Sequence, residues 1–409
     1  MPDPALSDLR VIEVAQGIAG PYCGKLLASY GADVIKVEPP GAGDLSRRFG
    51  PFPEDIPHLE KSGTFLHLNT SKRSVTLDIT GETGRLAFRR LLQNADILIE
   101  NCAPGQMAQW GLGYDDLKAD LPRLIYVSIS PFGQTGPYRD YKGNSLTAMA
   151  TSGVMYVTGA PDREPLTTGG EPAEYLAGMY AWLGALAALA YRDRENAGQQ
   201  VDVSLMEAAA SADEYSAAMY AFMGAIRRRY YSRHLFSYPS DIYACKDGHV
   251  VVSPAAQGFP SPTATDQGAS PMSLLLGDVE LDQNDLFRDR WARWFRWQEF
   301  ERLLQPYLES NSADEIVSFA QALRMPFAHV FNAAQLLENE HLRERGFFQE
   351  IDHPQAGRLK YTGDLFKADR MKAPLRRAPL LGEHNEEILG GELGYTKKDL
   401  EVLRGQGVI

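Results

Sequence analysis

The sequence has little cysteine, and what it has is scattered. Cys23, Cys102 and Cys245 are the only three in 409 residues, an odd number at wide spacing, so no disulfide framework is expected. Paired cysteines and a His-Glu-x-x-His sequence are also missing, and the eight histidines are dispersed. We therefore predict no metal site.

Targeting and membrane segments are lacking as well. Residues 1–8 have neither the basic start nor the apolar centre of a signal peptide. The apolar run 175–191 is shorter than the ~20 residues that span a membrane, and the charged segment 192–195 follows it directly. We expect a cytoplasmic protein without a membrane partner.

An excess of positive charge is absent too. The chain has 41 basic and 53 acidic residues, a balance that argues against nucleic acid as the main partner. Glycines at positions 17, 20 and 24 do not have the Gly-x-Gly-x-x-Gly spacing of a dinucleotide site, and no phosphate-binding Gly-x-x-x-x-Gly-Lys-Ser/Thr loop is present. Local basic groups and backbone amides must therefore hold any anionic ligand.

The pattern that is present predicts an α/β fold. With 44% hydrophobic residues the chain can bury a large core, which we expect to form two domains. Buried strands are predicted at 10–15, 32–38, 95–100 and 124–130, with helices between them. Alternating strands and helices over roughly the first 200 residues indicate a doubly wound domain with ligands at the carboxyl ends of its strands.

The composition changes after about residue 240. A hairpin with an Asp-Gly turn is predicted around 242–253, then a Pro/Ser/Gly-rich loop at 256–272 and aromatic-rich helices. We assign 240–330 to a second, smaller domain. The basic and aromatic run 227–234 has two interpretations, a solvated helix end or a segment that grips phosphate or a partner chain.

The stretch 167–192 is the most distinctive part of the chain. A glycine turn at 169–170 leads through Pro172, at a first helical position, into a long helix with almost no polar residue from 175 to 191. We expect that helix to be buried nearly all round. Glu174 lies in its opening turn, where the helix dipole favours the ionised carboxylate. The residue is either a simple cap or an ionised nucleophile.

Several stretches match a known family in order along the chain. They are 20–23 (Gly-Pro-Tyr-Cys), 31–41 (Gly-Ala-Asp-Val-Ile-Lys-Val-Glu-Pro-Pro-Gly), 69–74 (Asn-Thr-Ser-Lys-Arg-Ser), 95–101 (Ala-Asp-Ile-Leu-Ile-Glu-Asn), 104–105 (Pro-Gly), 198–208 (Gly-Gln-Gln-Val-Asp-Val-Ser-Leu-Met-Glu-Ala), 341–348 (His-Leu-Arg-Glu-Arg-Gly-Phe-Phe) and 381–384 (Leu-Gly-Glu-His). With these, the whole chain resembles the class III CoA-transferase family, also called the CaiB/BaiF family.

The resemblance implies an unusual architecture. A large doubly wound α/β domain is built from both chain ends, here 1–205 and 331–409, with 206–239 as linker helices. The smaller α+β domain at 240–330 is inserted between them. Two subunits are threaded through each other as an interlocked dimer, which is here either a homodimer or a pair with a homologous sister subunit.

The resemblance also places a catalytic carboxylate. Aligning 177–180 with the family pattern puts Glu174 at the position of the usual catalytic Asp. That carboxylate attacks an acyl-CoA thioester, and an enzyme-bound anhydride and then an enzyme–CoA thioester follow. The extra methylene of Glu moves the reacting oxygens, so the substitution bears directly on function.

Contacts to CoA are implied at further positions. The family's nucleotide-binding positions fall on Ile18, Ala19, Leu77 to Thr80, Asn101, Cys102, Ala103 and Lys142 to Asn144. Lys142 is a natural phosphate partner, as are Lys72 and Arg73. Pro39 and Gln109 stand where relatives often have arginine, so the phosphate grip is expected to be rearranged.

These observations predict a CoA-transferase that moves CoA from an acyl-CoA donor to a free organic acid, with CoA as substrate and no tightly bound cofactor. An alternative is a non-catalytic or partly catalytic subunit of a heteromer whose sister chain carries the usual Asp. An acyl-CoA racemase needs a His/Asp pair, whose positions are Asn144 and Glu174 here. Because Asn cannot act as a base, the racemase is disfavoured.

Overall fold

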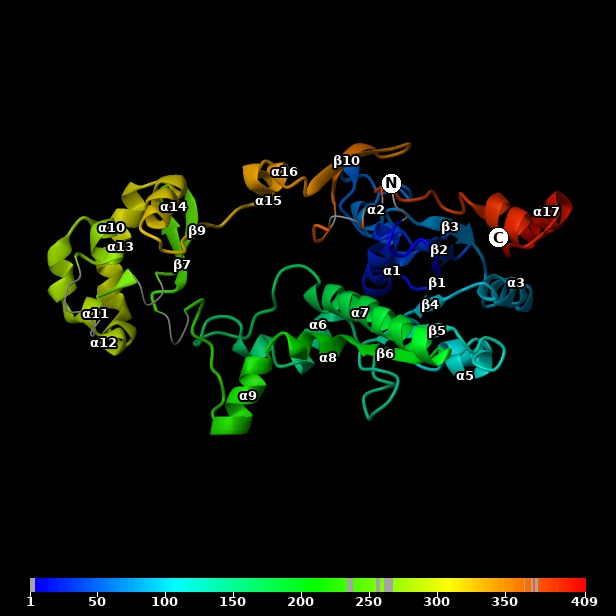
Figure 1. Ribbon diagram of the computed structural model, residues 1–409, viewed down its shortest axis with the longest axis horizontal. Helices are drawn as coiled ribbons and strands as arrows, with labels where there is room; N and C mark the ends of the chain where they lie inside the picture. Colours follow the sequence, from blue (N-terminus) through cyan, green and yellow to red (C-terminus); the bar gives the residue numbers. More distant parts are fainter. Residues whose placement is uncertain are drawn as a thin grey trace. The chain divides into compact units, whose positions relative to one another are not determined.

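The computed structural model describes residues 4–233, 238–254, 258–260, 268–363, 365–368, 371 and 374–409. It consists of two compact units, and each is described by itself (Figure 1). The first contains Met1–Met155, Thr167–Ile226 and His341–Ile409, and the second contains Tyr156–Leu166 and Arg227–Glu340. Most of the predicted loop at 256–272 and the end of the run 227–234 lie outside the described residues.

A six-stranded parallel sheet forms the centre of the first unit. Its strands lie in the order β3-β2-β1-β4-β5-β6. Their bounds are Arg10–Glu13 (β1), Asp33–Glu38 (β2), Arg73–Thr76 (β3), Ile97–Glu100 (β4), Ile125–Ser130 (β5) and Gln200–Ser204 (β6). The predicted α/β class is confirmed, and the four predicted strands are β1, β2, β4 and β5. The order reverses between β1 and β4, which is where doubly wound sheets bind ligands.

Helices cover both faces of this sheet (Figure 1). One face packs against α1 (Ala19–Ser29), α6 (Ser145–Thr151), α7 (Pro172–Glu195) and α8 (Leu205–Ser211). The other packs against α3 (Glu82–Leu92), the π-helix η6 (Glu386–Glu392) and α17 (Lys397–Gly405). Successive strand residues alternate between the two cores, Val11 and Ile12 for example, as the twofold repeat of a strand requires.

The carboxyl-terminal segment completes the first unit. Ser71 N–H donates to Arg376 O, and Asp78 N–H donates to Val408 O. The Asn385 side chain bonds the backbone N–H and the hydroxyl of Thr76 at 2.8 and 2.7 Å. Residues from the two ends of the chain therefore share one hydrogen-bonded edge at β3. Smaller elements of this unit are η1 (Leu45–Arg48), η2 (Pro53–Asp55), α2 (Gly63–Leu68), α4 (Gln106–Gln109), α5 (Tyr114–Leu117), α9 (Glu214–Met223), β10 (Phe348–His353) and β11 (Gly357–Thr362).

The second unit has its own core. Its antiparallel sheet consists of β7 (Asp241–Cys245), β8 (Gly248–Val252) and β9 (Ala328–His329), and β7 and β8 form the predicted hairpin. Its other elements are α10 (Pro271–Leu276), η5 (Val279–Gln283), α11 (Asp285–Arg288), α12 (Arg290–Phe295), α13 (Trp297–Ser310), α14 (Ala313–Ala322) and α15 (Ala333–Leu337). Two elements cross the boundaries of the units: η3 (Met155–Val157) begins in the first unit and continues into the second, and α16 (Glu340–Glu344) begins in the second and continues into the first.

The bounds of this unit are wider than the 240–330 predicted. It begins at Arg227, and it includes the separate segment 156–166. Arg229 explains that inclusion, because its guanidinium donates to the carbonyl oxygens of Tyr156, Ala160 and Arg163. Within the run 227–234, this arginine therefore has a structural role.

The burial of α7 differs from the prediction. Its buried side is a stripe of small residues that includes Ala177, Gly178, Ala181 and Ala185, and it packs on α1 and the sheet. Its other side, with Tyr180, Leu183 and Tyr191, is exposed within a single chain. The expectation of all-round burial is wrong for one chain, because only one face has a partner there.

Length and composition alone would let one helix of the described residues cross a membrane. That helix is α7, with 24 residues and a mean hydropathy of 1.2 in its best window. Core helices of globular proteins meet the same criteria, and the small-residue face of α7 packs into the core described above.

Candidate active site

The site begins at the reversal point of the sheet. The loops after β1 and β4 meet there, and Asn101 joins them. Its Oδ1 accepts the Gln16 N–H at 2.9 Å, and its Nδ2 donates to the Gln16 carbonyl oxygen at 2.6 Å. Asn101 therefore fixes the turn that precedes α1.

Glu174 lies in the first turn of α7 and faces the start of α1. Its Oε2 accepts the backbone N–H of Ala19, the first residue of α1, at 3.2 Å. The close approach depends on Gly178, because a Cβ there would lie 2.5 Å from the Ala19 carbonyl oxygen. The carboxylate therefore lies at the amino-terminal ends of two helices, whose dipoles both favour negative charge.

Burial outweighs those favourable interactions. Desolvation raises the pKa of Glu174 above the ordinary value, the Ala19 N–H opposes the rise, and the nearby Glu171 carboxylate adds to it. From the sequence we expected the helix end to favour the ionised carboxylate, but its effect on the pKa is smaller than that of burial. An ionised Glu174 carries a charge that water stabilises poorly, which suits a nucleophile.

A buried chain of charges supports the turn before α1. Gly17, with a φ of 81°, donates its N–H to Asp44 Oδ1 at 3.0 Å. Asp44 pairs with Lys36 at 2.5 Å, Lys36 pairs with Glu13 at 2.7 Å, and Glu13 pairs with Lys72 at 2.8 Å. All four side chains are fully buried, so loss of any one leaves an uncompensated charge below the site.

This arrangement corrects two expectations about phosphate binding. The Lys72 ammonium donates to Glu13, to Asn69 Oδ1 and to the Pro21 carbonyl oxygen, each at 2.8 Å, so all three of its N–H groups are used inside the protein. Arg73 pairs with Asp33, Glu387 and Glu392 at the β3 edge. We therefore remove both residues from the candidate CoA contacts.

A cavity of about 320 Å³ adjoins the loop after β4. Its lining brings together five of the predicted positions, Asn101, Cys102, Ala103, Lys142 and Gly143. It also contains Arg139, which sequence reasoning missed. The Nε of Arg139 has no hydrogen-bond partner among the described residues, so the guanidinium keeps a free donor beside the cavity.

The other predicted positions do not line this cavity. Leu77 is in the core and donates its N–H to the Glu38 carbonyl oxygen, and Thr80 is an exposed residue bonded to Asp78. Gln109 is exposed at the end of α4. Asn144 caps α6, where its Oδ1 accepts the Thr147 N–H at 3.0 Å. Ile18 is the N-cap residue of α1, immediately before the Ala19 amide that contacts Glu174.

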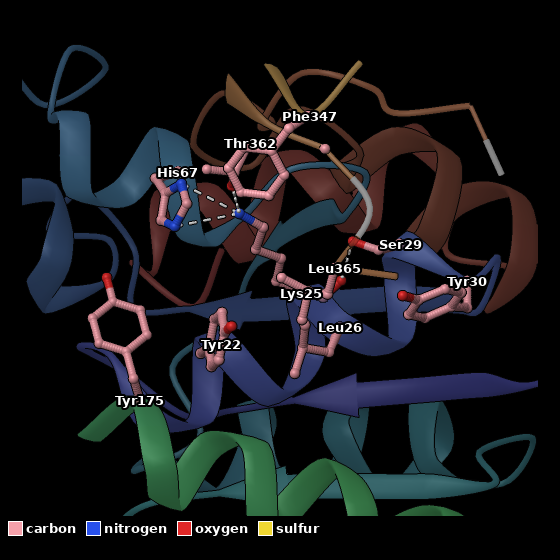
Figure 2. A pocket seen from close by; sticks show the side chains of 11 residues that line it. Tyr22, Lys25, Leu26, Ser29, Tyr30, His67, Tyr175, Phe347, Thr362 and Leu365 are labelled. Atoms are coloured by element: carbon pink, nitrogen blue, oxygen red, sulfur yellow. Dashed lines mark hydrogen bonds between the residues drawn. The ribbon is translucent and has the colours of Figure 1, made fainter. Parts of the chain in front are cut away.

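A second, smaller cavity of about 150 Å³ lies beside α1 (Figure 2). It is lined by Tyr22, Lys25, Leu26, Ser29, Tyr30, His67, Tyr175, Phe347, Thr362, Gly363 and Leu365. In Figure 2 the Lys25 amine points toward His67 and Thr362, and Tyr175 comes from the start of α7. Sequence reasoning gave no signal for this cavity, because its lining comes from four distant segments.

Fold and site together define a class of protein. A doubly wound sheet has a ligand-sized cavity with basic residues at its reversal point, and a buried carboxylate stands at two helix ends nearby. Among the described residues no group of three or more His, Cys, Asp or Glu side chains is placed to hold a metal ion. This is an α/β enzyme site that suits an anionic ligand and covalent chemistry on a carboxylate.

Comparisons with known proteins agree with this class. Residues 6–385 match the profile of CoA-transferase family III. The chain is 33% identical to a succinyl-CoA–D-citramalate CoA-transferase of Chloroflexus aurantiacus, over 100% of this chain and 99% of that one. It is 32% identical to the beta subunit of a succinyl-CoA–L-malate CoA-transferase of the same organism, over 99% and 98%. The crystal structure of a CaiB/BaiF family protein from Brucella suis superposes with a TM-score of 0.84 at 30% identity, over 95% of this chain and 99% of that one.

The chain therefore belongs to CoA-transferase family III. It is an enzyme that transfers CoA between an acyl-CoA and an organic acid, which confirms the prediction from the sequence.

Proposed function

We propose that Glu174 is the nucleophile of this CoA-transferase. The observation that carries the proposal is the placement of a buried carboxylate at the first turn of α7, against the Ala19 amide at the start of α1. A glutamate has the functional group of the usual aspartate on a longer side chain. A small shift of the start of α7 away from the substrate can compensate for the longer side chain.

The reaction follows from carboxylate chemistry. The Glu174 carboxylate attacks the thioester carbonyl of the donor, which gives a mixed anhydride and releases CoA thiolate. The thiolate attacks the glutamyl carbonyl, so that a glutamyl–CoA thioester forms and the first acid departs. The carboxylate of the second acid then attacks that thioester, and the same two steps in reverse give the new acyl-CoA and free Glu174.

The donor that we propose is succinyl-CoA. Both Chloroflexus relatives are named for transfer from succinyl-CoA, and each covers nearly the whole of this chain. The acceptor then is a second organic acid, exchanged at the same carboxylate. Cytoplasmic location stays a prediction from the sequence.

The cavity beside Asn101 is our proposed site for the nucleotide part of CoA. Lys142 and Arg139 supply positive charge there, and backbone N–H groups of the adjoining loop suit phosphate oxygens. Replacing Lys142 by Ala should weaken CoA binding by ~1–3 kcal/mol if the ammonium pairs with a phosphate. Calorimetry measures this, with Lys118→Ala, at the exposed residue that follows α5, as the control. Equal CoA affinity for both variants would remove Lys142 from the site.

The proposed assembly is an interlocked dimer, of two identical chains or of this chain with a homologous sister. The exposed apolar sides of α7 and α9 support a protein partner. One of the relatives is named a beta subunit, which keeps the sister-chain arrangement as a second candidate.

Assays of the purified chain test the proposed function directly. Succinyl-CoA is mixed with single organic acids, and the new acyl-CoA is separated and identified by mass. We expect transfer by this chain without any other protein, with ping-pong kinetics because the first acid leaves before the second binds. Transfer only after addition of a sister chain would establish the heteromer, and no transfer in either case would contradict the proposal.

A further inference from the structure

The cavity beside α1 contains a buried amine. Lys25 is only 4% exposed, and its Nζ lies 3.3 and 3.4 Å from the two ring nitrogens of His67 and 3.5 Å from the Thr362 hydroxyl. Figure 2 shows the amine beside His67, Thr362 and Phe347, with the Tyr22, Leu26 and Tyr175 side chains farther from it. The cavity therefore combines mostly apolar walls with one cationic group.

This amine has no counter-charge in the described part of the chain. No carboxylate there forms an ion pair with Lys25, and the nearby Lys72 ammonium repels it. His67 stays neutral, because burial and Lys25 lower its pKa to about 3. Burial and Lys72 lower the pKa of Lys25 to about 7. A buried lysine without an anion is costly, and an anionic ligand in the cavity would supply the counter-charge.

Two tyrosines that line the cavity come from the two helices that meet at Glu174. Tyr175 follows Glu174 directly, and its ring packs edge-on against Tyr22 with centroids 4.9 Å apart. Along α1, Lys25 lies six positions after Ala19, which is ~9 Å of helix. A four-carbon chain has three bonds of ~1.5 Å, and with a contact of ~3 Å at each end it extends over about 10 Å, close to that separation.

We propose that this cavity binds the far carboxylate of a short dicarboxylic acid, free or as its CoA thioester, with Lys25 as its counter-charge. The reacting carboxyl group then lies at Glu174, and the methylene chain lies against Tyr22, Leu26 and Tyr175. The assignment rests on the proposed function, since it places the substrate with respect to the nucleophile. Lys25 is thus a specificity-determining residue.

Kinetics with matched acids test the assignment. Lys25→Met keeps the length of the side chain and removes the charge, and succinate and butyrate have the same number of carbons. For succinate as acceptor we expect Lys25→Met to raise KM on the order of 10- to 100-fold, the usual effect of losing one charged hydrogen bond. The KM for butyrate should stay within about twofold, as should both values for Lys118→Met, at the exposed residue that follows α5. Equal changes for the two acids would overturn the proposal.

A binding experiment on the wild-type protein does not depend on turnover. Because the Lys25 amine is partly neutral near pH 7, succinate binding should draw a proton onto it, and calorimetry in two buffers of different ionisation enthalpy counts that proton. Acetic anhydride should acetylate Lys25, and succinate but not butyrate should protect it from acetylation. Peptide mass mapping measures the extent of acetylation at Lys25.

The two experiments separate the two claims. If no acid accepts CoA, the proposed function fails. Proton uptake and protection of Lys25 still show whether the cavity binds the carboxylate. Succinate binding without proton uptake and without protection of Lys25 would contradict the assignment even in an active enzyme.

Discussion

The character of Glu174 results from opposing effects on one carboxyl group. Two helix ends and the Ala19 N–H favour its charge, and removal from water opposes it more strongly, so the pKa is raised. The nucleophile must be ionised to attack a thioester. Transfer should therefore decline with falling pH at a higher pH than an exposed glutamate would cause.

Another buried carboxyl group makes the stability of the protein depend on pH. Burial raises the pKa of Glu100, at the end of β4, to about 7, although Ser128 and the Cys102 N–H oppose the rise. Because its ordinary value is 4.5, the folded protein holds this proton over a pH range in which the unfolded chain has lost it. The free energy of unfolding should therefore decrease from about pH 4.5 to about pH 7 and then level off, as far as Glu100 contributes.

Glu100→Gln removes this dependence. The amide oxygen can still accept the Cys102 N–H, and no charge forms above pH 7. We expect the variant to exceed the wild type by about 1–3 kcal/mol at pH 8 and to differ little at pH 4.5. Denaturant unfolding at both pH values measures this, with Glu82→Gln, at an exposed residue of the first turn of α3, as the control. A constant difference between Glu100→Gln and wild type at the two pH values is the contrary result.

Single residues also show what the sequence could not predict. The place of Glu174 at the start of an apolar helix left a cap and a nucleophile both open, and the family resemblance made it the candidate nucleophile. Lys72 was expected at a phosphate, but its partner Glu13 lies 59 positions away, and only the parallel pairing of β1, β2 and β3 brings their side chains together. Lys25 and Arg139 gave no local signal, because their roles depend on cavities built from distant segments.

At the scale of elements, the site depends on how α1 and α7 approach each other. Gly178 makes the contact possible, because a Cβ there would lie 2.5 Å from the Ala19 carbonyl oxygen of α1. Periodicity and capping patterns predicted both helices from the sequence. Their contact is a tertiary property, so the Ala19–Glu174 hydrogen bond was not predictable.

Two helices have apolar sides that a single chain leaves open. None of the residues of α9 is buried, and Phe222 is 91% exposed. Tyr180 and Leu183 of α7 are exposed as well. Exposed apolar surface of this extent indicates a protein partner, which the proposed interlocked dimer supplies.

The dimer should be independent of concentration. Threaded chains separate only when one of them unfolds, so sizing with light scattering at nanomolar concentration should show two chains per particle. Phe222→Asp should reduce the yield of dimer, while Leu86→Asp on the exposed side of α3 should not. A folded single chain of the wild type at nanomolar concentration would rule out the interlocked arrangement.

At the scale of the molecule, the sequence predicted the α/β class and an inserted second domain, and the bounds were less predictable. The segment 156–166 belongs to the second unit because the Arg229 guanidinium, some 70 positions away, donates three hydrogen bonds to its carbonyl oxygens. Contacts between segments so far apart leave no periodic pattern in the sequence. That both chain ends build the large domain was likewise predicted only from the family resemblance. The hydrogen bonds between Asn385 and Thr76 at β3 give its physical basis.

The central claim is that Glu174 carries the reaction as a covalent intermediate. The direct measurement is peptide mass mapping after the protein is incubated with succinyl-CoA and quenched, with hydroxylamine added to a parallel sample to trap the activated carboxyl group. We expect CoA, or the hydroxamate, on Glu174 in the peptide that contains the start of α7, and neither in Glu174→Gln, whose transfer rate should fall by several orders of magnitude. An unmodified Glu174 together with a normal transfer rate for Glu174→Gln in a preparation of this chain alone would contradict it.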